Sequence, residues 1–166
     1  ALLRETEASG EPLDVLVGDM PPGTGDAPLS VAQSLPLSGG VIVTLPQDVS
    51  LHDARRGLEM FRQLQVPLFG VVENMSYLEL PDGSRMDIFG TGGGQRLAKE
   101  SGVPFLGGIP LDPAVREGGD RGTPVVVTRP DSPVAQALRR IGEDIAARVV
   151  AAAARQGPTI SISMIG

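Results

Sequence analysis

The chain has 166 residues, of which 41% are hydrophobic and 20% charged, and its formal net charge is −6. This length and composition fit one globular domain with its own core, and the acidic balance argues against nucleic-acid binding because phosphate backbones repel a negative surface. Cysteine is absent and histidine occurs once, so these residues alone cannot form a disulfide, a thiolate zinc site or a cysteine-ligated cluster.

Targeting and membrane segments are not visible in the sequence. The longest purely apolar stretch, Val149 to Ala154, is too short to span a bilayer. The first residues form no secretion signal, and there is no starting methionine. We therefore expect a cytoplasmic fragment of a longer protein, without membrane binding.

Short apolar, β-branched runs alternate along the chain with helical patterns, as in βαβ units around a parallel sheet. The runs are continuous rather than alternating, which is typical of strands buried on both faces. We predict an α/β fold with a parallel sheet flanked by helices, in a single domain over residues 1–155 followed by a flexible tail over 156–166. The expected strands are Leu13–Val17, Gly40–Leu45, Leu68–Val72, Phe105–Ile109 and Val125–Val127.

Helices are expected where capping residues precede apolar positions at helical spacing. Glycine after such a segment marks its end, because it adopts the left-handed conformation easily. The predicted boundaries are a cap at Asp26, a cap at Asp48 or Ser50 with the helix running to about Leu64, a turn at Thr91–Gly94 opening a helix that Gly102 ends, and a cap at Asp131–Ser132 before Pro133.

The strongest local signal follows the first expected strand and reads Asp19-Met20-Pro21-Pro22-Gly23-Thr24-Gly25-Asp26. A strand there would deliver Asp19 at its carboxyl end, where ligands bind in open α/β sheets. Its carboxylate could hold Mg²⁺ beside nucleotide phosphates, and backbone N–H groups of the turn at Gly23 could face a γ-phosphate. The alternative is a strand followed by a capped helix with no ligand.

Together with four later segments, this string resembles the Mrp/ApbC family of ATP-binding iron–sulfur cluster carriers, within the MinD/ParA-like class of P-loop NTPases. The first string is similar to the Walker B and switch II signature of that family. The resemblance covers about Leu13 to Val149. The later segments, in family order, are Val43–Val49 with the helix residues Asp53–Gly57, Gly70–Tyr77, Ile88–Gly94 and Pro104–Pro113.

The resemblance implies ATP and Mg²⁺ as ligands, ATP hydrolysis in the intact protein, an iron–sulfur cluster, a homodimer and apoprotein clients. It implies that Asp19 and Gly23 act at the phosphates, with Asp19 on the metal. It also implies that Asn74 hydrogen-bonds the adenine, while the segment containing Pro110 and Asp112 lines the other side of the base. An amide suits a purine edge because it both donates and accepts. The alternative for Asn74 is a turn-capping amide.

Two features depart from that family. No Gly-x-x-x-x-Gly-Lys-Ser/Thr loop occurs, and Lys99 lies in a helical pattern at the wrong spacing. The family's Cys-Pro-x-Cys pair falls on Leu80 and Gly83, within a segment that reads as a hairpin turn. We therefore expect that these residues alone do not hydrolyse ATP and provide no cysteine ligands for a cluster.

Two other functions fit the same residues. A MinD/ParA-like positioning ATPase often ends in a membrane-binding amphipathic helix, but the last helix expected here is alanine-rich at its end and has no aromatic face. A non-catalytic dimerisation remnant would keep the fold without turnover, and the missing loop favours that alternative.

Overall fold

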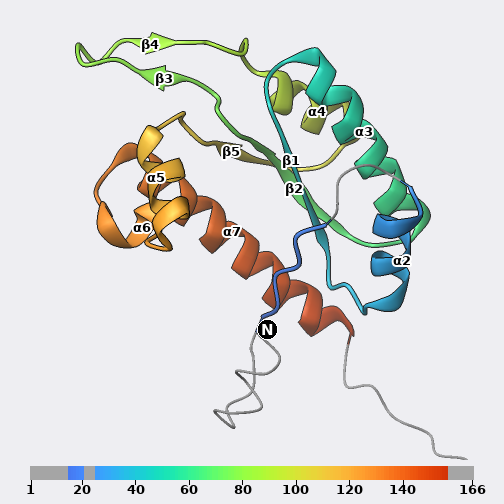
Figure 1. The fold of residues 1–166 in the computed structure, drawn as a ribbon. Helices are drawn as coiled ribbons and strands as arrows, with labels where there is room; N and C mark the ends of the chain where they lie inside the picture. The colour runs from blue at the N-terminus through green and yellow to red at the C-terminus, as the bar shows by residue number, and fades with distance from the viewer. Residues whose placement is uncertain (1–14, 21–24, 157–166) are drawn as a thin grey trace, which may run out of the picture.

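A computed structural model describes residues 15–20 and 25–156 of the chain. Its centre is a parallel sheet in the order β1-β2-β5 (Figure 1), formed by Gly40–Thr44, Leu68–Glu73 and Phe105–Gly108. A helix lies in each crossover, α3 (Asp48–Gln63) between β1 and β2 and α4 (Gly93–Ser101) between β2 and β5. Parallel neighbours require such crossovers. The predicted α/β class is confirmed, and these three strands agree with their predicted ranges to within one residue.

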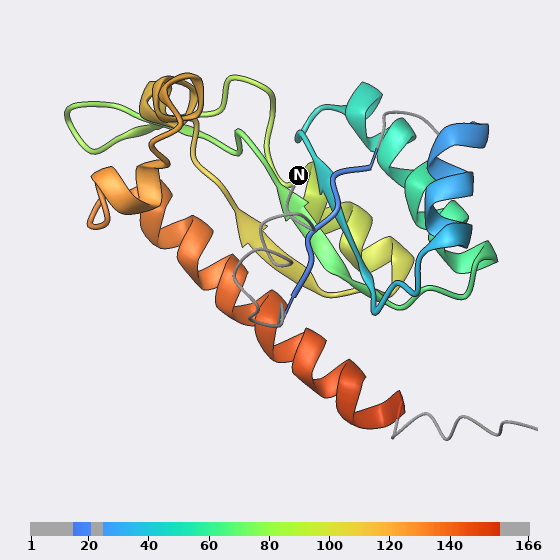
Figure 2. The same cartoon turned by 60° about the horizontal axis from the view of Figure 1, so that its bottom comes forward.

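Helices cover both faces of the sheet. Helices α3 and α4 pack on one face, and the long α7 (Pro133–Gln156) crosses the other, as Figures 1 and 2 show from two directions. Helix α2 (Asp26–Ser34) lies beside α3 (Figure 1), where its Leu29 packs against the core. The central strand β2 is thus enclosed from both sides, which explains its continuous apolar sequence.

The main core lies between the sheet and helices α3 and α4. Leu51, Leu58 and Leu97 are at most 1% exposed, and they pack with Val71 of β2. Burying a side chain of this size contributes about 1.5–3 kcal/mol. The helical spacing of the apolar residues in 51–64 predicted this face of α3, and four of them are buried: Leu51, Ala54, Leu58 and Phe61.

Capping of α7 follows the predicted pattern. The Ser132 hydroxyl accepts a hydrogen bond from the Ala135 amide at 3.3 Å and donates to the Arg129 carbonyl at 2.7 Å. Pro133 is the first helical residue, a position where its missing N–H costs nothing. The helix includes Gln156, the first residue of the predicted tail over 156–166, and the rest of that tail lies outside the described residues.

Two predicted caps are wrong by one position. Helix α3 begins after Gln47, whose backbone is extended, so Asp48 is already helical, and its carboxylate contacts Arg96 instead of the backbone. Helix α2 begins after Gly25, which makes Asp26 its first residue. In contrast, α4 follows the predicted glycine turn and ends at Gly102, which has a φ of 63°.

The predicted strand Val125–Val127 is wrong. Those residues begin the short helix α6 (Val125–Thr128), in which the Val127 and Thr128 amides both donate to the Pro124 carbonyl. Val125 is buried while Val127 is 73% exposed. Three β-branched residues are compatible with a strand only if another strand lies alongside, and here the neighbours are helices α5 (Pro113–Arg121) and α7.

The predicted strand Leu13–Val17 is also wrong wherever the structure describes it. Residues 15–20 form no regular structure, and Val17 is 84% exposed. No ladder among the described residues joins them to β1, the outer strand of the described sheet. A strand exists only through pairing, and without a neighbour an apolar run stays extended but unpaired. Leu13 and Asp14 lie outside the described residues.

Candidate functional site

The carboxyl ends of the three parallel strands lie level with one another. In the strand register, Thr44 of β1 pairs with Glu73 of β2, and Glu73 pairs with Gly108 of β5. All three residues end their strands, so the segments that follow them emerge at one edge of the sheet. This edge is where open α/β sheets bind ligands.

Asn74 follows β2 at this edge and is half-buried. Its backbone N–H donates to the Thr44 carbonyl at 2.8 Å, which ties it to the end of β1. Its side-chain Oδ1 accepts from the Met75 amide at 3.0 Å, and Met75 has a left-handed φ of 52°. The Oδ1 atom therefore caps the turn, as the alternative interpretation of Asn74 expected. No described residue accepts a hydrogen bond from Nδ2, so that end of the amide can serve a ligand.

The segment after β5 runs beside the segment after β2. Ile109 donates to the Glu73 carbonyl at 2.8 Å, Ser76 donates to the Ile109 carbonyl at 2.9 Å, and Leu111 donates to the Tyr77 carbonyl at 2.7 Å. These alternating backbone bonds bring residues 109–112 alongside residues 74–77, the two segments that the family resemblance assigns to a base.

Pro110 is buried, but the Asp112 side chain already has partners. Its Oδ1 accepts from the Ala114 amide at 2.8 Å and lies 3.8 Å from Arg129. Asp112 is thus the N-cap of α5. Both residues line a cavity of about 260 Å³ with Leu78 and Val134, and Asn74 is not among the lining residues.

The predicted phosphate residues are less completely placed. Asp19 is exposed in the irregular segment 15–20, and Gly23 lies outside the described residues. Within the described ranges, no three His, Cys, Asp or Glu side chains gather as a metal site. Magnesium bound beside a nucleotide needs only one or two carboxylates, with phosphates and water as the other ligands. An exposed single carboxylate such as Asp19 fits that donor set.

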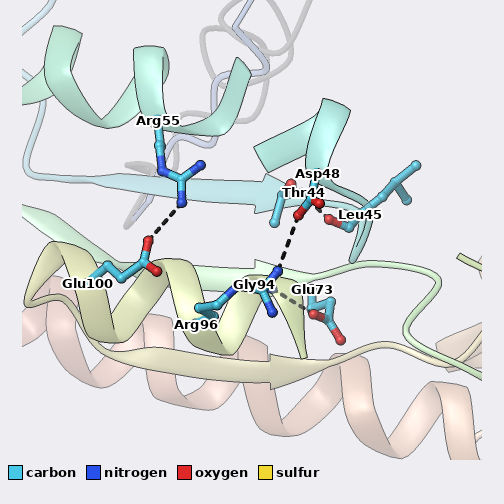
Figure 3. A network of polar contacts seen from close by, with 8 residues as sticks. All are labelled: Thr44, Leu45, Asp48, Arg55, Glu73, Gly94, Arg96 and Glu100. Atoms are coloured by element: carbon cyan, nitrogen blue, oxygen red, sulfur yellow. Dashed lines mark hydrogen bonds and ion pairs between the residues drawn. The ribbon is translucent and has the colours of Figure 1, made fainter. Parts of the chain in front are cut away.

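Sequence reasoning missed Glu73, a buried carboxylate that is only 2% exposed. Its Oε1 accepts from the Ser76 hydroxyl at 2.5 Å, and its Oε2 accepts from the Gly94 amide at 2.7 Å. Figure 3 shows this side chain reaching the first turn of α4. The one available hint was its place at the end of an apolar strand, where a carboxylate needs hydrogen-bond partners.

Helices α3 and α4 are also joined by ion pairs (Figure 3). Arg55 lies 2.7 Å from Glu100, and Arg96 lies 3.3 Å from Asp48. All four side chains are exposed, and such pairs contribute only about 0–1 kcal/mol. The packing of the two helices therefore depends mainly on the apolar core beneath them.

The predicted hairpin is confirmed at the positions aligned with the cysteine pair. It joins β3 (Leu78–Glu79) to β4 (Arg85–Met86), and the Leu80 amide donates to the Ser84 carbonyl. Gly83 has a φ of 80° and donates to the Leu80 carbonyl. The Ser84 hydroxyl and amide donate to Asp82, and these bonds hold the pKa of the Asp82 carboxyl below its ordinary value.

Among the described residues, no helix combines the length and the apolar character that a membrane crossing requires. Even α7, the longest with 24 residues, carries charged side chains along its length.

Comparison with known proteins places this geometry in context. Residues 2–146 match the family described as NUBPL iron-transfer P-loop NTPase, of the ParA group. An iron-sulfur cluster carrier protein of Synechocystis sp. is 56% identical over 144 residues, covering 85% of this chain and 40% of that protein. The chain thus spans less than half the length of this curated relative.

Solved structures agree with the fold. A nucleotide-binding protein from Archaeoglobus fulgidus, in complex with ADP, is 38% identical with a TM-score of 0.56, and the match covers 62% of this chain and 43% of that one. The Aquifex aeolicus MinC:MinD complex matches 99% of this chain and 60% of its own chain with a TM-score of 0.56. Its 21% identity supports the fold alone.

Proposed function

Because the chain belongs to the NUBPL iron-transfer family of P-loop NTPases, we propose that it is the base-binding part of an ATP-dependent iron–sulfur cluster carrier. The observation that carries this proposal is the position of Asn74. It follows the central strand at the level carboxyl edge of the sheet, with residues 109–112 hydrogen-bonded alongside its turn. ADP in the Archaeoglobus fulgidus neighbour supports a nucleotide as the ligand.

In this proposal, Nδ2 of Asn74 donates to a ring nitrogen of adenine. Oδ1 has a second lone pair, so it can accept from the exocyclic amine while it also accepts from the Met75 amide. Pro110 contributes apolar surface on the other side of the base. Asp112 acts indirectly, because its carboxylate caps α5 and so fixes the end of the 109–112 segment.

At the phosphates, Asp19 would hold Mg²⁺, which supplies positive charge against the phosphate oxygens when it is bound. The turn at Gly23 would direct backbone N–H groups to the γ-phosphate. The printed sequence has no Gly-x-x-x-x-Gly-Lys-Ser/Thr loop, so the lysine and amides that cradle the phosphates must come from outside these 166 residues. ATP hydrolysis is therefore proposed for the intact protein and not for this chain alone.

The iron–sulfur cluster is cargo in this account. The chain has no cysteine, and the positions aligned with the family's pair are closed into a turn by their own backbone bonds. We therefore propose that the thiolates holding the cluster come from an apoprotein client or from protein outside these residues. We also propose that the intact protein is a homodimer, as the family resemblance implies.

Paired substitutions test the nucleotide site in the full-length gene product. Asn74→Ala is expected to weaken ATP binding by about 1–3 kcal/mol, since the adenine edge loses its partner, and to erode the preference for ATP over GTP. Asp19→Ala is expected to reduce the magnesium dependence of binding and leave that preference intact. Isothermal titration of both nucleotides, with and without magnesium, measures both effects.

The opposite phenotypes make the two assignments separable. If Asn74→Ala lowers the melting temperature but leaves nucleotide affinity and base preference unchanged, Asn74 is only a turn cap and the base site lies elsewhere. If Asp19→Ala leaves the magnesium dependence unchanged, Asp19 is not the metal ligand.

A further inference from the structure

Glu73 buries a carboxylate at the point where the candidate base segment begins. Among the residues whose burial the structure describes, it is the one Asp or Glu with a buried side chain. An ionised carboxylate is costly to remove from water unless hydrogen bonds replace its hydration. Both of its oxygens have such partners, the Ser76 hydroxyl on Oε1 and the Gly94 amide on Oε2.

The bond to Ser76 closes a loop over Asn74 and Met75. Glu73 and Ser76 flank these two residues, and Met75 adopts the left-handed conformation, which costs energy for a side chain other than glycine. The Ser76 Oγ also lies close to Gly108, since a Cβ on that glycine would be 2.8 Å from it. The hydrogen bond between Glu73 and Ser76 therefore joins the two residues on either side of Asn74 and Met75.

The bond to Gly94 fixes the same carboxylate against α4. The N-cap of α4, Gly92, has no side chain, so Glu73 supplies the cap from another element. A carboxylate at a helix N-terminus is favourable because it meets unpaired N–H groups and the positive end of the helix dipole. The contact is close as well, since a Cβ on Gly94 would lie 2.9 Å from the Cβ of Glu73.

From this geometry we propose that Glu73 is the positioning residue for the base site, its carboxylate holding the Asn74–Met75 turn in its strained conformation by joining Ser76 to the first turn of α4. The proposal rests on the proposed function in one respect, that Asn74 reads the base. In this proposal Glu73 acts through Asn74. The side chain thereby links the end of β2, the turn that follows it and the first turn of α4.

Four variants, one of them a control, test the proposal. Glu73→Ala removes both hydrogen bonds. Glu73→Gln is the conservative rescue, because its oxygen can accept from the Gly94 amide while its NH₂ group donates to the Ser76 hydroxyl. Leu97→Ala is the matched control: it removes a fully buried side chain of α4 and leaves both hydrogen-bond partners of the carboxylate in place. Ser76→Ala removes a single bond and provides a milder variant if Glu73→Ala does not fold.

The first readout needs no nucleotide. Amide hydrogen exchange at Asn74 and Ser76, whose N–H groups bond Thr44 and Ile109, is measured in the chain itself. Each variant is measured the same number of degrees below its own melting temperature. Exchange is expected to be faster in Glu73→Ala or Ser76→Ala than in Leu97→Ala. In Glu73→Gln it is expected to be near the wild-type rate. Equal exchange in Glu73→Ala and Leu97→Ala would overturn the proposal, since the carboxylate would then only stabilise the fold.

The second readout is the ratio of GTP to ATP dissociation constants in the full-length gene product, which measures the preference for ATP. The ratio is expected to fall about tenfold in Glu73→Ala, as for one lost buried hydrogen bond, and to stay within about threefold of wild type in Glu73→Gln. An unchanged ratio in Glu73→Ala, in a protein where Asn74→Ala does change it, overturns the positioning role. If Asn74→Ala leaves the ratio unchanged, the proposed base site fails instead, which is a different result.

Discussion

Substituting alanine for glycine at two helical positions should change stability in opposite directions. Gly93 is the first residue of α4, and a Cβ there would lie 2.0 Å from the Pro46 carbonyl oxygen, 2.8 Å from its carbon and 3.1 Å from a Leu51 methyl group. The first two are backbone atoms of the segment that follows β1, so they cannot rotate away. Gly142 lies in α7, and beyond the backbone of that helix no described residue would come within 4 Å of a Cβ placed there.

The magnitudes follow from those distances. Gly93→Ala must push α4 away from the sheet edge, and overpacking of this kind typically costs about 1–3 kcal/mol. Gly142→Ala meets no neighbour and gains helix propensity, which is expected to stabilise the chain by about 0.5–1 kcal/mol. For a chain of this length, 1 kcal/mol corresponds to about 2–4 °C in melting temperature.

Urea unfolding followed by circular dichroism measures both free energies of unfolding, with thermal melts as a second probe. Gly93→Ala is expected to have the lower midpoint and Gly142→Ala the higher one, relative to the unmodified chain. Equal or greater stability of Gly93→Ala would show that the first turn of α4 does not pack against Pro46 as described. The Glu73 contact to Gly94 would then lose its geometric basis, because it depends on the same turn.

Four further outcomes are expected. The chain alone should release phosphate from ATP no faster than buffer does, because it has no phosphate loop; magnesium-dependent release that Asp19→Asn abolishes would contradict this. Reconstitution with iron and sulfide should leave the chain colourless, since it has no cysteine, and a stable cluster absorbance would show that other ligands suffice. The outer edge of β1 is unpaired among the described residues, so the chain should associate or melt below a version extended upstream; a monodisperse monomer that gains nothing from extension would argue otherwise. In a carboxyl NMR titration, Asp82 should have a pKa below 3.8 that Ser84→Ala raises; its hydrogen bonds should persist above that pKa and be lost as the pH falls through it, and an identical midpoint in both proteins would exclude the hydroxyl as the cause.

Local signals in the sequence predicted most of the fold. The glycine turn and Gly102 bracketed α4, and Asp131–Pro133 marked the start of α7, because capping and proline chemistry act within one turn of the chain. The predicted strands at Leu13–Val17 and Val125–Val127 were wrong for a shared reason. Both runs have β-branched composition, but strand formation depends on a neighbouring strand, which composition cannot reveal.

The candidate site shows the same division between local and long-range information. The placement of Asn74 at a strand end was predictable from the apolar run before it, and the structure agrees. The hydrogen bond between Glu73 and Gly94 joins residues 21 apart in the sequence. No local sequence pattern around either residue predicts this contact. Proline after an aspartate is typical of a helix start, and this pattern could have predicted that Asp112 caps α5. The family resemblance implied a position beside the base.

Photolabelling tests the central claim, that this chain carries the adenine site, most directly. The full-length gene product would be irradiated with 8-azido-ATP, digested with trypsin and mapped by mass spectrometry. The account predicts label on the tryptic peptides that span residues 63–85 and 100–116, which contain Asn74 and Pro110, with protection by excess ATP but much less by GTP. Label confined to other peptides, or equal protection by both nucleotides, would contradict it.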